Sequence, residues 1–309
     1  MTSKKRIISY IEIVGGLRDS AFFCRVYFFS LLFLISLNQV KAQSPDVTVE
    51  DVRFESEGVT LAGTIYTPQH SHAAVVLVHG SDQTPRMGDF ASLLAENGIL
   101  VLTYDKRGIG ESGGIYAGPE VGTNNIDPAN LILLAKDANA AINVLHQRDI
   151  NIPIGLVGFS QAGWIIPIAA NNNSLVDFMV LFSGSMVPTL EQLRFQFFTE
   201  GKLDFWDNHT EAEVREHIRS AADRYQFANT DPCDALNILS IPGLWLFGEK
   251  DTQVPVGLSI ERLNALKVQG KPYEYCLFST LGHNLTFSDS IEPVNIAIHW
   301  IKDRKHYLK

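Results

Sequence analysis

The sequence predicts an α/β fold, with a mostly parallel central sheet, helices on both faces and a small helical cap. Short, nearly continuous apolar runs alternate along the chain with stretches of helical pattern. Strands of this kind are buried on both faces and are joined by helical crossovers, as in parallel sheets. The chain has 309 residues and is 46% hydrophobic, so it is long enough to bury one large core.

The strands and helices follow from these runs in chain order. Residues 49–67 predict two strands that turn at Glu57 and Gly58. Six further strands are expected at 73–80, 99–105, 154–160, 177–184, 241–251 and 273–280. Helices are expected at 86–97, 128–147, 161–171, 256–268 and 291–304.

Residues 188–235 are longer than a usual crossover and carry helical patterns of their own. We therefore expect two or three helices there, inserted as a cap on the domain. The cap is rich in aromatic residues, which either line a substrate pocket or only pack the cap onto the body: Phe195, Phe197, Phe198, Phe205 and Trp206.

The N-terminal region has the pattern of a secretory signal peptide. Residues 26–37 are apolar or small, Arg25 precedes them, and a Val-Lys-Ala sequence ends at Ala42. We expect residues 1–42 to be cleaved after Ala42, which leaves residues 43–309 as an exported protein, periplasmic or secreted. The alternative is a membrane anchor, but the apolar run is shorter than the roughly 20 residues of a span. The mature chain is therefore expected to bind no membrane.

Composition excludes several classes of function. The mature chain has a formal charge near −13 and no basic cluster, so we expect no nucleic-acid partner. It contains no P-loop, no HExxH sequence and no Cys/His cluster, so we expect no cofactor and no metal. Cys233 and Cys276 either form a disulfide or remain free thiols, and the apolar surroundings of Cys276 favour free thiols. The sequence does not indicate an oligomeric state.

The candidate nucleophile is Ser160, which follows an apolar strand and precedes a helix. In open α/β sheets, function gathers at the carboxyl ends of the strands. A serine on a sharp strand-to-helix turn needs small neighbours two residues before and two residues after it, because strand and helix approach closely there. Gly158 meets this need, and Ala162 replaces the usual second glycine by one methyl group.

A nucleophilic serine needs a base, and the base needs an orienting acid. Among nine histidines, His283 follows the last strand in a loop that contains glycine, so it is the expected base. Asp251 ends the preceding strand and is the expected acid, with Glu249 as its rival. The chain order serine, aspartate, histidine is that of the α/β-hydrolase triad.

The backbone N–H groups of Ser81 and Gln161 are the expected oxyanion hole. Gln161 follows the nucleophile, and Ser81 lies in the turn after another strand, where Gly80 permits a tight approach. His79 in the same turn is expected to brace it rather than act as the base. Trp164 is expected to contact the substrate in the acyl pocket.

The chain resembles the α/β-hydrolase superfamily, in its serine-aminopeptidase-like and carboxylesterase branch. The matching motifs span roughly residues 50–305 and are LVHGS (77–81), YDKRGIGESGG (104–114), GFSQAGW (158–164), GEKDTQVP (248–255) and LGHNL (281–285). The resemblance implies the fold and the triad but does not specify the substrate, because the branch includes esterases, thioesterases and peptidases. The loop after LVHGS continues as DQTPRMGD and need not match a defined esterase group.

One further motif, GIGESG (108–113), fits the dinucleotide-binding fingerprint G-x-G-x-x-G. That fingerprint must open a helix, whereas the residues that follow here cannot be helical. We therefore interpret it as a structural loop in which Arg107 pairs with Asp105.

The motifs together predict an exported serine hydrolase that acts on carboxylic esters. Its partner is then a small-molecule acyl substrate. Peptide, aminoacyl or thioester hydrolysis is the alternative, and a non-catalytic binding protein on the same fold is a third hypothesis. An enzyme selective for free amines would need a carboxylate near the acyl site, and the cap offers Glu191, Glu200, Asp204 and Asp207.

Overall fold

The computed structural model describes residues 46–116, 129–148, 150–224, 228–286 and 288–304. The predicted signal peptide, residues 1–42, lies outside these ranges. Within them, no helix combines the length and the apolar character that crossing a bilayer requires. Cys233 and Cys276 are both free thiols.

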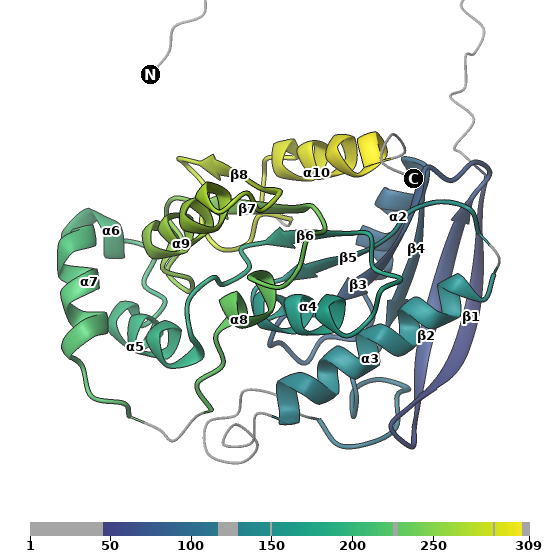
Figure 1. The fold of residues 1–309 in the computed structure, drawn as a ribbon, viewed down its shortest axis with the longest axis horizontal. Coiled ribbons are helices and arrows are strands. Elements are labelled where there is room, and N and C mark those ends of the chain that lie inside the picture. Colours follow the sequence, from purple (N-terminus) through teal and green to yellow (C-terminus); the bar gives the residue numbers. More distant parts are fainter. Residues whose placement is uncertain (1–45, 117–128, 149, 225–227, 287, 305–309) are drawn as a thin grey trace, which may run out of the picture. The chain divides into compact units, whose positions relative to one another are not determined.

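Eight strands form one twisted sheet in the order β1-β2-β4-β3-β5-β6-β7-β8 (Figure 1). Their bounds are β1 (Val47–Ser56), β2 (Val59–Pro68), β3 (Ala73–Val78), β4 (Ile99–Tyr104), β5 (Ile154–Phe159), β6 (Phe178–Phe182), β7 (Gly243–Gly248) and β8 (Tyr273–Phe278). Strand β2 pairs antiparallel with β1 and β4, and every pair from β4 onward is parallel. The mostly parallel α/β fold predicted from the apolar runs is confirmed.

Helices cover both faces of the sheet, as expected for strands that are apolar on both sides. One apolar core lies beneath α2 (Gly88–Glu96) and α10 (Glu292–Lys302). The other lies beneath α3 (Ala129–His146), α4 (Ala162–Asn171) and α9 (Val256–Val268). Helix α10 and helices α3 and α4 are seen on opposite sides of the sheet in Figure 1. Strand β3 is buried along its whole length, which fixes the centre of the sheet.

The central strands end where their sequences turn from apolar to polar. Strand β4 stops at Tyr104, and β5 stops at Phe159. The next residues, Asp105 and Ser160, each donate one more backbone hydrogen bond to a neighbouring strand and lie at the carboxyl edge of the sheet. This edge therefore carries the candidate functional residues, as parallel α/β sheets require.

The segment predicted as a cap contains α5 (Thr189–Thr199), α6 (Phe205–Asn208) and α7 (Glu211–Ser220), followed by α8 (Pro232–Leu236). A capping box between Thr210 and Glu213 starts α7. Phe195 and Phe205 are buried with side chains of α7 in a small apolar cluster of their own. These two aromatic side chains therefore pack the helical insertion itself. Leu236 of α8 instead joins the main core.

Candidate active site

Ser160 occupies a strained turn between β5 and α4. Its φ angle is +51°, in the left-handed region that side-chain-bearing residues rarely adopt. The turn is fixed because the Ser160 N–H donates a 3.0 Å hydrogen bond to the carbonyl of Phe182 at the end of β6. Helix α4 begins two residues later, so its N-terminal N–H groups lie at the same edge of the sheet as this serine.

The close approach of β5 and α4 explains the missing glycine of the motif. A Cβ atom on Gly158 would lie only 2.4 Å from the Ala162 Cβ and 2.6 Å from the Ile166 Cδ1. The methyl group of Ala162 therefore fills the space that Gly158 leaves. In this geometry the two positions cannot both carry a methyl group, and here the earlier one is glycine.

His283 and Asp251 form a hydrogen-bonded pair. The Nδ1 of His283 lies 2.8 Å from the Asp251 Oδ2. The two loops meet because Gly248, at the end of β7, carries no side chain; a Cβ atom there would lie 2.3 Å from the Gly282 carbonyl oxygen. Asp251 and His283, which the sequence predicted as acid and base, are thus adjacent in space.

The Asp251 carboxylate is held in one orientation. Its side chain is fully buried, and its Oδ1 accepts hydrogen bonds from the N–H groups of Gln253 (2.6 Å) and Val254 (2.9 Å). The Oδ2 atom is thereby turned toward His283. The rival acid, Glu249, is exposed.

Ser183 is a site residue that the sequence reasoning did not identify. It follows β6, has a φ of +50°, and its hydroxyl donates a 2.7 Å hydrogen bond to the carbonyl of His283. The bond anchors the backbone of the candidate base to the end of β6, which is separated from β8 by β7. The sequence signal that could have identified Ser183 is its position directly after an apolar strand.

The helical insertion binds the loop of the candidate acid through three side chains. Trp206 Nε1 donates to the carbonyl of Asp251 at 2.8 Å. Thr199 Oγ1 donates to the carbonyl of residue 252 at 2.6 Å, and Gln196 Nε2 to that of residue 253 at 3.2 Å. Three consecutive carbonyls of this loop are therefore oriented by the insertion.

The turns that carry the Ser81 and Gln161 N–H groups, the predicted oxyanion hole, lie close together at the carboxyl edge of the sheet. Gly80 lies against the nucleophile turn, since a Cβ atom on it would be 3.6 Å from the Ser160 Cβ. Among the hydrogen bonds of the described residues, none is donated by the backbone N–H of Ser81 or of Gln161. Within the part of the chain that the structure describes, neither N–H group therefore has a protein acceptor. Their catalytic role stays a prediction.

His79 braces the turn after β3. It is buried, and its Nε2 lies 2.6 Å from the carbonyl oxygen of Tyr104 on β4. Burial lowers the pKa of His79, so the imidazole is neutral and donates to that carbonyl. This contact agrees with a structural role rather than with that of the base.

The expected pair of Arg107 with Asp105 is wrong. Arg107 instead bonds Asp137 of α3, with Nε–Oδ2 at 3.1 Å and Nη2–Oδ1 at 2.5 Å. Asp105 is paired with Arg86, with Nε–Oδ1 at 3.1 Å and Nη2–Oδ2 at 2.8 Å. The chain turns at residues 107 and 108, where Gly108 has a φ of +74°, so Arg107 leaves the direction of β4 and reaches α3 instead of Asp105.

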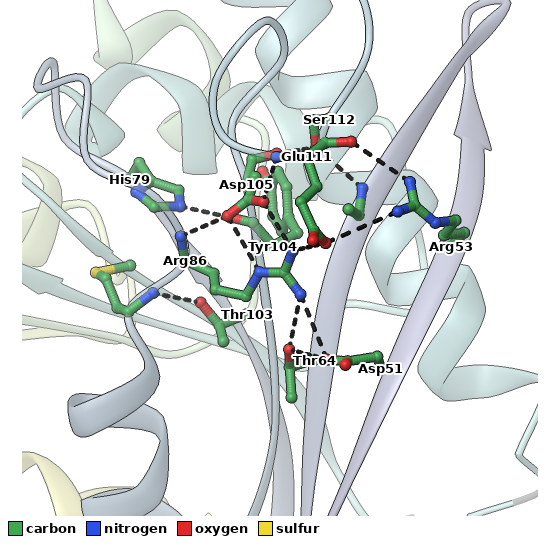
Figure 2. Close-up of polar contacts among 12 residues, drawn as sticks. Asp51, Arg53, Thr64, His79, Arg86, Thr103, Tyr104, Asp105, Glu111 and Ser112 are labelled. Carbon is green, nitrogen blue, oxygen red and sulfur yellow. Dashed lines mark hydrogen bonds and ion pairs between the residues drawn. The ribbon is translucent and has the colours of Figure 1, made fainter.

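Arg86 is the centre of a polar network that joins the loop after β3 to the turn after β4 (Figure 2). Besides Asp105, its guanidinium contacts Glu111 at 2.8 Å, Thr64 at 2.9 Å and Asp51 at 3.5 Å. Burial alone raises the pKa of Asp105, but the hydrogen bonds from Arg86 and from backbone N–H groups lower it below its usual range. The carboxylate is therefore charged near neutral pH.

Trp164 is buried in the first turn of α4. Its indole N–H donates a 2.9 Å hydrogen bond to the carbonyl of Val187, in the segment that leads into the insertion. The side chain therefore braces that segment, and its contact with substrate stays a prediction.

The sheet order, the strained serine turn and the aspartate–histidine pair are those of the α/β-hydrolase fold, which the solved structures below share. Residues 69–200 match the family described as serine aminopeptidase, S33.

Two solved structures show the same fold at low sequence identity. The esterase Pf2001 of Pyrococcus furiosus is 17% identical, with a TM-score of 0.59 over 87% of this chain and 95% of its own. The acylaminoacyl peptidase of Pyrococcus horikoshii is 16% identical, with a TM-score of 0.58 over 89% of this chain and 43% of its own. Among curated proteins, esterase EstD of Thermotoga maritima is 27% identical over 254 residues, 72% of this chain. That match spans 58% of EstD.

Proposed function

We propose that the protein is a serine hydrolase that cleaves carboxylic esters through an acyl-enzyme on Ser160. The observation that carries the proposal is the 2.8 Å contact between His283 and Asp251, at the same edge of the sheet as the strained Ser160 turn. The esterase names of two similar proteins and the serine aminopeptidase family match support hydrolase chemistry.

The proposed mechanism follows from the hydrogen bonds of the pair. Asp251 accepts from the Nδ1–H of His283, which leaves Nε2 as the acceptor for the Ser160 hydroxyl proton. Ser160 attacks the acyl carbonyl while His283 takes its proton, and the leaving alcohol then receives that proton. Water attacks the acyl-enzyme in the second half, again with His283 as the base.

The N–H groups of Ser81 and Gln161 stabilise the oxyanion in this proposal. Both are available to donate, and both lie beside the turn that carries the nucleophile. Such donors act mainly on the tetrahedral intermediate, where negative charge develops on the former carbonyl oxygen.

Esters are preferred over free-amine substrates because the charges of the insertion face solvent. Glu200 is exposed and pairs with Lys202 at 2.6 Å, and Asp204 and Asp207 are exposed as well. Among the four candidate carboxylates, only Glu191 is half-buried. The peptidase alternative rests on the description of the matching family and on the similarity to an acylaminoacyl peptidase.

A fluorophosphonate probe tests the nucleophile. We expect it to label the wild type and the Ser92→Ala control, whose serine lies on α2 and bonds Glu96, but not Ser160→Ala. Equal labelling of Ser160→Ala, or no labelling of the wild type, would overturn the proposal and leave the non-catalytic hypothesis.

The substrate class is tested by kcat/KM on nitrophenyl esters of graded length beside aminoacyl nitroanilides. We expect the esters to be hydrolysed faster at every concentration below saturation. Faster anilide hydrolysis would make the peptidase alternative the better description.

Export is a separate proposal that rests on the apolar run at 26–37 and the small residues before position 43. The mass of the protein recovered from a host that processes secretory leaders tests it. A mature chain that begins at Gln43 is expected, and an unprocessed N-terminus would contradict it.

A further inference from the structure

Lys106 is a buried lysine beside the candidate oxyanion hole. Only 2% of the residue is exposed, although lysine is among the residues least often buried. It follows β4 by two positions, and its Nζ donates to the backbone carbonyls of Gly80 and Asp82, the latter at 3.2 Å. Burying an ammonium group costs free energy unless strong partners compensate. A buried lysine is therefore weak evidence for a gain in folding stability, and the location of its two carbonyl partners is the more informative observation.

The two carbonyls flank the residue whose N–H is the candidate donor. In a trans peptide, the C=O of one residue and the N–H of the next point in opposite directions. Because Lys106 binds the Gly80 carbonyl, the Ser81 N–H of the same peptide plane points away from Lys106. Gly80 itself lies against Ser160. The orientation of this one peptide plane thus decides whether the Ser81 N–H is available at the nucleophile.

A second contact fixes the next peptide plane. The hydroxyl of Tyr116 donates a 2.6 Å hydrogen bond to the Ser81 carbonyl, and the Lys106 Nζ lies 5.6 Å from the centre of the Tyr116 ring. Three consecutive carbonyls, those of residues 80, 81 and 82, are therefore held by two side chains. The far end of the loop is held by Arg86 on Asp105, the residue just before Lys106 (Figure 2).

We propose that Lys106 is a positioning residue for the oxyanion hole, which holds the Gly80–Ser81 peptide so that the Ser81 N–H faces the reacting carbonyl. The proposal rests on the proposed function, because the Ser81 N–H can stabilise an oxyanion only if Ser160 forms a tetrahedral intermediate. Lys106 acts through the backbone and does not touch the substrate.

The protonation state of Lys106 gives this role a pH dependence. Burial lowers the pKa of Lys106 to about 8, against a smaller opposing effect of the Asp82 carboxylate. His79 of the same turn is neutral, and the Tyr116 ring faces the ammonium from the segment after β4. Charge-assisted hydrogen bonds are about twice as strong as neutral ones, so the hold on the loop weakens when the proton is lost.

The test compares Lys106→Met with Lys271→Met. Lys271 is a matched control, because its Nζ also donates to two backbone carbonyls, those of Asn237 (2.5 Å) and Leu239 (2.8 Å), at the opposite end of β8 from the His283 loop. For Lys106→Met we expect kcat on a nitrophenyl ester to fall about 10- to 100-fold with KM within about threefold, since losing one oxyanion donor costs roughly 10²–10³ in kcat. For Lys271→Met we expect wild-type kcat.

An inhibitor that forms a tetrahedral adduct on serine gives a second readout. A trifluoromethyl ketone is expected to bind Lys106→Met about 10- to 100-fold more weakly than the wild type. A merely structural role would move Ki and KM together. Equal factors in Ki and KM, a kcat within threefold of the wild type, or equal losses in the two lysine variants would each overturn the proposal.

Lys106→Arg covers the case in which the methionine variant does not fold. Arginine keeps its charge at every accessible pH. We expect the wild-type kcat to decline above about pH 8 and the Lys106→Arg profile to show no decline there; identical profiles would overturn the proposal. If the wild type itself neither hydrolyses esters nor reacts with fluorophosphonate, the proposed function fails and this inference fails with it. An active, labelled wild type with an unaffected Lys106→Met overturns this inference alone.

Discussion

The indole N–H of Trp206 donates a 2.8 Å hydrogen bond to the backbone carbonyl of Asp251. The bond connects the helical insertion directly to the residue that orients His283. Thr199 and Gln196 bind the next two carbonyls in the same way. The insertion therefore helps to set the geometry of the candidate triad.

Trp206→Phe removes this donor and keeps an aromatic ring in its place. A net hydrogen bond contributes about 1 kcal/mol, so we expect kcat to fall about fivefold if all of that free energy is lost from the transition state. Trp300→Phe is the matched control, because the Trp300 Nε1 donates to Glu274 on β8 at 2.9 Å. Steady-state kinetics should show a loss in the first variant only, and equal kcat values would show that the insertion does not orient the acid.

Asp251→Asn tests the assignment of the acid. The amide cannot hold the imidazole in the required tautomer, so we expect kcat to fall by about 10⁴ with the fold intact by circular dichroism. Glu249→Gln, two residues away on the exposed side of the loop, should keep wild-type kcat. A loss in Glu249→Gln and not in Asp251→Asn would reverse the assignment.

Gly158→Ala tests the packing between β5 and α4. The new methyl would lie 2.4 Å from the Ala162 Cβ, so we expect the free energy of unfolding to fall by about 1–3 kcal/mol in urea titrations. The double variant Gly158→Ala/Ala162→Gly should recover at least half of that loss. Gly113→Ala is the control, since its new methyl meets nothing closer than 3.4 Å. A double variant no more stable than the single one would contradict the idea that the Ala162 methyl group occupies the space left by Gly158.

As pH rises through the pKa of Lys106, its titration should increase the free energy of unfolding while kcat falls. The pKa of Lys106 is lowered from 10.5 to about 8 in the folded protein. Between these pH values the unfolded chain holds the proton and the folded chain does not, so this group raises the free energy of unfolding as pH rises. We expect the difference in unfolding free energy between wild type and Lys106→Met to increase from pH 8 to 10.5 in urea titrations. A constant difference would mean that Lys106 does not titrate in this window.

The sequence was sufficient for the fold because the sheet is buried on both faces. Strands such as β3 and β7 are then apolar at nearly every position, and their limits are visible where polar residues begin. The same logic gave Ser160, Asp251 and His283 as candidates, since each lies in the first few residues after a strand.

Contacts between side chains and a distant backbone leave no sequence pattern comparable to the apolar runs of the strands. Nothing near Trp206 in the sequence indicates that it binds a carbonyl 45 residues away. Arg86 lies outside the shared motifs, so its pairing with Asp105 was not predicted, and Arg107 was assigned to that carboxylate because it was near in sequence. The partner of Arg107 is Asp137 on α3, and only the packing of that helix on the sheet brings the two together.

The pairing of the loop after β3 with Asp105 and Lys106 sets a rule for exchanging parts with other hydrolases. Residues 80–86 contribute the carbonyls and the arginine that satisfy two adjacent buried side chains of opposite charge. A graft that replaces this loop alone would leave Asp105 with only the N–H of Glu111 and would remove the carbonyl partners of Lys106, at a cost of several kcal/mol. Residues 80–86 and the turn that carries Asp105 and Lys106 therefore have to be exchanged together. Chimeras that move both segments are expected to fold and to hydrolyse substrate.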